Sequence, residues 1–348
     1  MNPKWQEFLA HQGAAIKNNR VTSFGSSSDH IYALDQTYLC DLSTLGVIHA
    51  TGVDALSFLH GQFTNDLNNV SPEHSQLSSY CNHKGRMLSI FRVYKNDDNY
   101  SAILPRDVLE QTMNKLNMFK LRASVELTNQ SDDHVIFGIA GPDTESVLND
   151  LDFKLPKQTH DSLHNNEITI IRLQSTNIRV LVIANPDTAI SIFKQMADKF
   201  SFATSDVWDL HDIHSGIPQI TASISEAFIP QMTNLDLIDG VSFSKGCYPG
   251  QEVVARTHYL GKPNRRMYRI QIGGANNVEP AMNIFSPEDA TQPVGKIVVA
   301  QKEAADSTSA LVVMRTEKKN DNDLHLDSVS GPQVFVKSLP YSLETNSK

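Results

Sequence analysis

The segment Lys245-Gly-Cys-Tyr-Pro-Gly-Gln-Glu252 is the most informative stretch of this chain. It places a cysteine two residues after a lysine, inside a glycine-flanked turn, and leads into a helix-like segment, Gln251–Thr257. A thiol reacts as the thiolate, and a nearby ammonium or the positive end of a helix favours that anion. Two interpretations follow. The octapeptide presents a reactive, accessible Cys247, or it is a tight turn in which the cysteine is small filler.

The bulk composition is that of a globular protein with more than one core. The chain has 348 residues, of which 40% are hydrophobic and 20% charged, and this length predicts two or three domains. No run approaches the roughly 18 apolar residues that span a bilayer. The N-terminus lacks a signal-peptide core and predicts a short amphipathic helix through Trp5, Phe8 and Leu9. We therefore expect a cytoplasmic location.

The cysteines are few and odd in number: Cys40, Cys81 and Cys247. Such a set is no disulfide framework and fits a reducing compartment. No Cys-x-x-Cys spacing is present, so we expect no protein-built zinc or iron–sulfur site.

The formal net charge of −9 argues against nonspecific nucleic-acid binding, which depends on Lys and Arg neutralising phosphates. One local exception is the basic turn formed by Lys262, Arg265, Arg266 and Arg269. It is interpreted as a solvated turn leading into a strand, and the minority alternative is a contact with RNA or an anionic ligand.

Hydrophobic periodicity predicts an α+β chain that ends in an all-β region. A strand–helix–strand–strand–helix order over residues 135–200 is that of a split βαβ, ferredoxin-like unit. A similar block precedes it, a third amphipathic helix spans residues 205–214, and short β runs from residue 265 onward predict a small barrel. The polar segment 317–329 is predicted to be a hairpin tip.

The order of several motifs identifies a family. Four segments carry the resemblance, and the ending Leu339-Pro-Tyr-Ser342 adds to it: Phe58-Leu-His-Gly-Gln-Phe-Thr-Asn-Asp-Leu67, Cys81-Asn-His-Lys-Gly-Arg86, Phe228-Ile-Pro-Gln-Met-Thr-Asn-Leu235 and Lys245–Glu252. Together they resemble the YgfZ family, folate-binding relatives of the glycine-cleavage aminomethyltransferase (GcvT, or T-protein). The resemblance runs from about residue 30 to residue 342.

The resemblance implies an α+β fold of three domains in a ring, with two ferredoxin-like α/β domains and a C-terminal β-barrel. The expected boundaries are an N-terminal helical extension at 1–28, a discontinuous folate-binding region at 29–130 and 205–260, a ferredoxin-like domain at 131–204 and the barrel at 261–348.

The same resemblance implies a function. The family binds tetrahydrofolate and supports assembly or repair of iron–sulfur clusters in client enzymes, notably the radical enzyme that methylthiolates tRNA. Expected partners are thus folate and such enzymes, with no stable direct binding of nucleic acid and no membrane. Two alternatives remain: a tetrahydrofolate-dependent aminomethyl or one-carbon transferase, and an RNA-binding or structural scaffold with a vestigial folate pocket.

Site residues carry over from the family signature. Cys247 is the expected functional thiol, and Lys245 is its expected electrostatic partner. The remaining motif residues are expected to shape the loop, Gly250 through a backbone conformation closed to other residues and Glu252 by capping the next helix or pairing with Arg256; they are Gly246, Tyr248, Gly250, Gln251, Glu252 and Arg256.

Three residues fall on folate-contact positions of the family. Trp208 matches a tryptophan and either stacks on the pterin or aminobenzoyl ring or packs in the core. Leu45 replaces a second tryptophan and supplies apolar contact without stacking. His214 replaces a glutamate of the transferase and lacks its bidentate geometry.

The transferase's acidic pair is replaced by Leu88 and Ser89. Leucine cannot accept a proton or stabilise a developing cation, so the methylene-transfer chemistry has lost its group. Asp66, Glu226 and Asp239 remain formal acidic candidates. The chain is therefore interpreted as an accessory protein rather than an enzyme.

Overall fold

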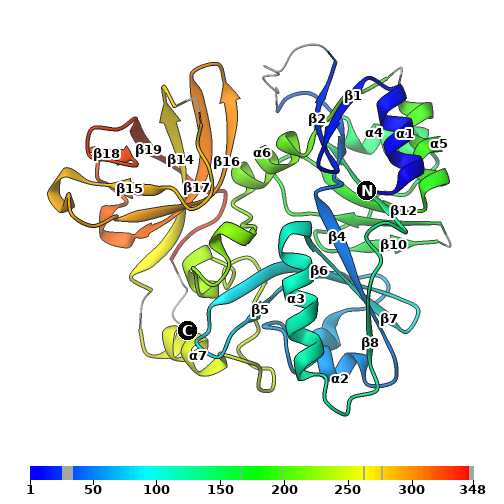
Figure 1. Ribbon diagram of the computed structural model, residues 1–348, viewed down its shortest axis with the longest axis horizontal. Coiled ribbons are helices and arrows are strands. Elements are labelled where there is room, and N and C mark those ends of the chain that lie inside the picture. Colours follow the sequence, from blue (N-terminus) through cyan, green and yellow to red (C-terminus); the bar gives the residue numbers. More distant parts are fainter. Residues whose placement is uncertain (26–33, 166, 198, 262, 276, 345–348) are drawn as a thin grey trace. The chain divides into compact units, whose positions relative to one another are not determined.

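The computed structural model describes residues 1–25, 34–165, 167–197, 199–261, 263–275 and 277–344 (Figure 1). Its contacts divide the chain into two compact units. The first is built from Met1–Phe58, Leu67–Gln76 and Phe91–His211, and the second from Leu59–Asp66, Leu77–Ile90 and Asp212–Lys348. No helix within the described residues has the length and apolar character needed to cross a bilayer.

A six-stranded sheet of order β10-β11-β12-β9-β3-β13 is the centre of the first unit. All neighbours are antiparallel except β13, which runs parallel to β3. Its strands are β3 (Tyr38–Asp41), β9 (Val135–Ala140), β10 (Ser162–His164), β11 (Ile168–Arg172), β12 (Arg179–Ala184) and β13 (Ser201–Ala203). The apolar run Val135–Ala140 is buried at every residue because this sheet is covered on both faces.

Three helices cover one face of that sheet: α1 (Pro3–His11), α4 (Thr144–Asp150) and α5 (Pro186–Met196). Trp5 of α1 packs edge-on against Phe193 of α5, with ring centroids 4.8 Å apart, and Phe193 meets Phe137 of β9 at 5.1 Å. The predicted N-terminal helix is confirmed, with Trp5, Phe8 and Leu9 on its buried side. A hairpin, β1 (Ala14–Lys17) with β2 (Arg20–Phe24), follows it in the segment predicted to be only helical.

A five-stranded sheet has the order β5-β6-β7-β4-β8. Its strands are β4 (Leu45–Thr51), β5 (Gln76–Cys81), β6 (Met87–Asn96), β7 (Asn99–Pro105) and β8 (Glu126–Asn129), with α2 (Ala55–His60) and α3 (Arg106–Phe119) between them. Val108, Leu109 and Leu116 lie on the buried side of α3. The remaining helices are α6 (Ser205–Ser215) and α7 (Gln251–Tyr259).

The C-terminal strands form a closed barrel of order β14-β17-β16-β15-β18-β19, as predicted for this region. They are β14 (Arg265–Gly273), β15 (Asn283–Phe285), β16 (Gly295–Ala304), β17 (Ser307–Arg315), β18 (Leu324–Leu326) and β19 (Gln333–Lys337). The prediction of a hairpin tip at 317–329 is wrong. Strand β18 pairs with β15 and β19, and Leu324 is fully buried. The sequence pattern of this strand, Leu324 and Leu326 alternating with polar residues, is too short to predict a strand.

A partly buried histidine in the first unit, His160, is held in its neutral form. The Nη1 atom of Arg92 lies 2.9 Å from Nδ1 of His160 and 3.1 Å from Oγ of Ser75, whose hydroxyl donates to the His160 carbonyl at 2.8 Å. Burial, helped by the positive charge of Arg92, lowers the pKa of His160 to about 3. The ring accepts from a guanidinium, which can only donate, so protonation would break this contact.

This arrangement predicts acid sensitivity. An unfolded histidine binds a proton below a pKa of about 6.5. The folded ring binds one only near pH 3, so the free energy of unfolding falls as the pH drops between those values. Replacing His160→Asn suits the residue's φ of +75°. Between pH 7.5 and 5, the free energy of unfolding measured in urea should fall by about 2 kcal/mol less in this variant than in the native protein. The exposed His11→Asn is the matched control, and equal pH slopes for both variants would contradict the account.

Candidate functional site

The thiol of Cys247 is the accessible one. Cys247 is exposed on the loop before α7, whereas Cys40 and Cys81 are buried. Burial raises the pKa of both buried thiols, that of Cys81 to about 12. Because the thiolate is the reactive form, these two residues are inert packing groups and Cys247 is the candidate for chemistry.

The loop that carries Cys247 is anchored by the ammonium group of Lys245. Its Nζ donates to the main-chain carbonyl of His60, to that of Phe63 at 2.7 Å and to that of Asn65 at 3.3 Å. It also lies 5.3 Å from the ring centre of Tyr248. Three carbonyl acceptors use all three donors of an ammonium group. The motif loop is therefore joined to a segment about 180 residues earlier, inside the same unit.

This anchoring role was not predicted from the sequence. Lys245 is 8% exposed, and burial lowers its pKa to about 8, with the carboxylate of Asp66 opposing the shift. Among the described residues, no hydrogen bond or ion pair joins Lys245 to Cys247. The electrostatic partnership between the two residues therefore stays a prediction.

A close approach of two backbones fixes the other side of the loop. Gly250 has a φ of +80°, and a Cβ added there would lie 2.5 Å from the carbonyl oxygen of Asn82 and from backbone atoms of Gly85. Gly85 itself has a φ of +71°. The conformation is thus one that glycine adopts at little cost, as expected for Gly250. By contrast, a Cβ at Gly246 would meet only Nε2 of His60, at 4.0 Å.

The two glycines of the motif offer a matched test. Gly250→Ala should lower the free energy of unfolding by about 2–4 kcal/mol, because it combines backbone strain with a backbone overlap. Gly246→Ala should change it by less than about 1 kcal/mol, since the site is open. Urea unfolding of both variants measures this difference, and equal effects would show that the close approach at Gly250 is unimportant.

The other motif residues lie around the loop. The Tyr248 ring is 7% exposed, and its burial raises the pKa of its hydroxyl. Nε2 of Gln251 lies 3.5 Å from the carbonyl oxygen of Lys245. Glu252 is exposed in the first turn of α7, where no side chain caps the helix, and among the described residues no ion pair joins it to Arg256. Neither predicted role of Glu252 is therefore present.

Trp208 packs in the core of the first unit. It is 3% exposed, the Arg179 guanidinium lies 4.8 Å from its ring centre, and a Cβ at Gly138 would lie 2.2 Å from the ring. Leu45 packs against the same cluster. The structure therefore brings these two folate candidates together, in the packed arrangement that was the alternative to stacking on a ligand. Their contact with folate stays a prediction.

His214 belongs to the second unit, and both of its ring nitrogens have protein partners. Nη1 of Arg269 lies 2.8 Å from Nδ1, and Oε1 of Glu303 lies 2.9 Å from Nε2. The hydrogen bond from His214 is the main cause that lowers the pKa of Glu303 to about 2. A guanidinium only donates, so Nδ1 is the acceptor and Nε2 carries the proton. Any bond from His214 to a folate ring would have to replace one of these contacts.

The three described arginines of the basic turn lie on strand β14, and the interpretation as a solvated turn is wrong for Arg266, which is 4% exposed. Arg266 and Asp236 form a buried two-pronged ion pair at 2.5 and 3.0 Å. Arg265 donates to the carbonyl of Val294 at 3.2 Å, and Arg269 to that of Ser338 at 3.2 Å as well as to His214. Lys262 lies outside the described residues. Arg266 and Arg269 join β14 to segments outside the barrel, whereas Arg265 bonds to the residue before β16, within the barrel.

The positions of the lost acidic pair lie in a packed core. Leu88 is 1% exposed and Ser89 fully buried. The formal acidic candidates are elsewhere in the second unit. Glu226 accepts from Nδ2 of Asn82 at 3.1 Å, and Asp66 lies 3.4 Å from Nδ1 of His60. Asp239 contributes its main-chain carbonyl to Nδ2 of Asn65.

Comparison with known proteins places this site in a family. The model of the GCVT N-terminal domain matches residues 6–183. The "tRNA-modifying protein YgfZ" of Yersinia enterocolitica is 30% identical over 312 residues, which are 88% of this chain and 92% of that one. The protein of the same name from Photorhabdus laumondii is 30% identical over 308 residues, with the same coverage. The chain belongs to the YgfZ family.

Membership of the YgfZ family agrees with the fold. The glycine cleavage system aminomethyltransferase T from Bartonella henselae superposes with a TM-score of 0.79, over 98% of this chain and 97% of that one, at 13% sequence identity. The fold is thus GcvT-like α+β with a closed six-stranded C-terminal barrel, as predicted.

Proposed function

We propose that this protein is a tetrahydrofolate-binding accessory protein of tRNA modification, and that its Cys247 thiol supports iron–sulfur enzymes such as a tRNA methylthiotransferase. Similarity over 88% of the chain to proteins named tRNA-modifying supports the pathway. The GcvT-like fold supports a folate or folate-derivative ligand. The observation that carries the proposal is the exposed Cys247 on a loop fixed at both sides by Lys245 and Gly250.

The thiol acts on a client rather than holding a cluster. Iron–sulfur clusters are bound by four ligands, mostly cysteines. Cys247 supplies one, because Cys40 and Cys81 are buried with raised pKa values. A single exposed thiol on a rigid loop suits transient contact with a partner's cluster or sulfur.

The fold also admits one-carbon transfer, and the alternative function is a tetrahydrofolate-dependent aminomethyltransferase. For this function the chain lacks an acidic residue at positions 88 and 89, where Leu88 and Ser89 are buried. Formation of methylene-tetrahydrofolate from an aminomethyl donor by the purified protein would favour this alternative.

A cellular assay tests the proposed function. In a bacterial strain that lacks its own YgfZ protein, this chain should restore methylthiolated nucleosides in tRNA, measured by mass spectrometry. Cys247→Ala should lower that restoration at least tenfold at equal protein level. The control variant Ser244→Ala changes an exposed neighbour of the motif and should restore fully. Full restoration by Cys247→Ala would refute the role of the thiol.

A further inference from the structure

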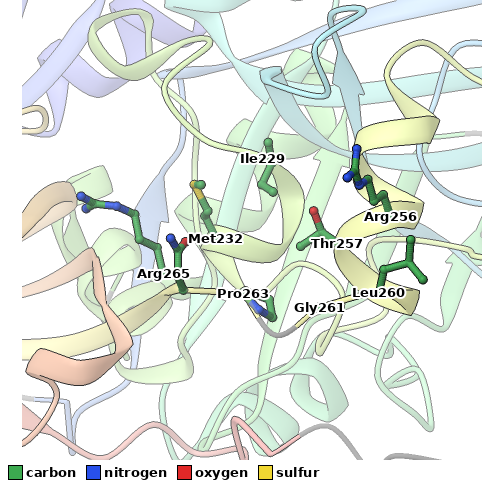
Figure 2. Close-up of a pocket in the computed structure, with 9 residues that line it drawn as sticks. Ile229, Met232, Arg256, Thr257, Leu260, Gly261, Pro263 and Arg265 are labelled. Atoms are coloured by element: carbon green, nitrogen blue, oxygen red, sulfur yellow. The ribbon is translucent and has the colours of Figure 1, made fainter.

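The second unit contains a pocket that the proposed function does not use. Its volume is about 490 Å³, and it lies beside the C-terminal half of α7 (Figure 2). Its lining comes from the 229–232 segment, from α7 and from the chain that enters the barrel; the residues are Ile229, Met232, Arg256, Thr257, Leu260, Gly261, Pro263, Asn264 and Arg265. The volume lies within the range of small-molecule sites.

The pocket offers an apolar surface that the fold leaves uncovered. Ile229, Met232, Leu260 and Pro263 supply its hydrocarbon lining. Leu260 is 80% exposed, and the adjacent Tyr259 is 66% exposed. Contact of a ligand with this lining would remove apolar area from water at roughly 25 cal/mol per Å².

Among the described residues, one charged side chain of the lining has no hydrogen-bond or ion-pair partner. Arg265 donates to the Val294 carbonyl, and Figure 2 shows its side chain extending away from the other lining residues. In the described part of the chain, the Arg256 side chain forms neither a hydrogen bond nor an ion pair, whereas its main-chain carbonyl accepts from the N–H of Leu260 at 3.0 Å. Its guanidinium is therefore available at the pocket, in a protein whose net charge is −9. A guanidinium presents paired donors that suit carboxylate, sulfonate or phosphate oxygens.

We propose that this pocket binds a small anionic ligand with an apolar aryl or alkyl body, its anionic group on Arg256 and its body against Met232 and Leu260. The site is separate from the thiol, because Cys247 precedes the start of α7 whereas Arg256, Thr257 and Leu260 lie at its end. Helix α7 thus joins the thiol loop to a ligand site at its other end.

The probe is 8-anilinonaphthalene-1-sulfonate, an aryl sulfonate that fluoresces in apolar sites. Arg256→Gln should weaken binding of the sulfonate about 5- to 20-fold. Arg256→Lys keeps the charge but loses the paired N–H donors of the guanidinium, so its affinity should lie between those of Arg256→Gln and the native protein. The uncharged analogue N-phenyl-1-naphthylamine should bind the native protein and Arg256→Gln equally. Unchanged thermal unfolding confirms that each variant is folded.

The matched control is Arg122→Gln, which removes an exposed arginine beside another exposed apolar side chain, Leu121 at 88% exposure. It should leave binding of the sulfonate unchanged. The proposal would be overturned if Arg256→Gln bound the sulfonate with the affinity of the native protein. It would also be overturned if only Arg122→Gln weakened sulfonate binding. Displacement of the sulfonate by tetrahydrofolate, at concentrations at which tetrahydrofolate itself binds the protein, would also overturn the proposal, because the pocket would then belong to the folate site.

Discussion

The site depends on one buried ammonium. Lys245 donates to the main-chain carbonyls of His60, Phe63 and Asn65, and so fastens the motif loop to a segment far away in the sequence. A buried charge is costly unless its donors are satisfied, and a buried carbonyl that loses its donor costs about 1–3 kcal/mol. The lysine and the carbonyls therefore stabilise each other only when the loop is in place.

The second restraint is steric. Gly250 and Gly85 allow the motif loop and the 82–86 turn to approach at backbone distance. Cys247 lies between the ammonium anchor and this contact, so its loop is held at both ends while the thiol faces solvent. A group that must meet a partner protein benefits from such preorganisation, because less conformational entropy is lost on contact.

Long, strongly periodic segments were predictable from the sequence. The order of strands and helices over residues 135–200 was predicted from hydrophobic periodicity, and the closed barrel from repeated short β runs. Strands of three residues, such as β10, β13 and β18, were missed because three positions are too few to show a hydrophobic periodicity. The family motifs located Cys247, Gly250 and the missing acid.

The contacts of the site residues were less predictable. The acceptors of Lys245 are backbone atoms, which no side-chain pattern marks, and they lie about 180 residues away. Glu303 and Arg269 reach His214 from barrel strands, again through separations that periodicity does not report. Arg179 and Gly138 enclose Trp208 from neighbouring strands of one sheet. In each case tertiary packing decides the role.

The central claim is that the Lys245 ammonium fixes the thiol loop. Amide hydrogen exchange tests it at Ser242 and Gln251, whose N–H groups donate to the carbonyls of Thr64 and Tyr248 on either side of the loop. The test variant is Lys245→Met, and the exposed Lys84→Met is the control beside the same loop. The account predicts exchange at least tenfold faster in Lys245→Met, which corresponds to about 1.4 kcal/mol or more of lost local stability, and no change in Lys84→Met. Unchanged exchange in Lys245→Met would contradict it.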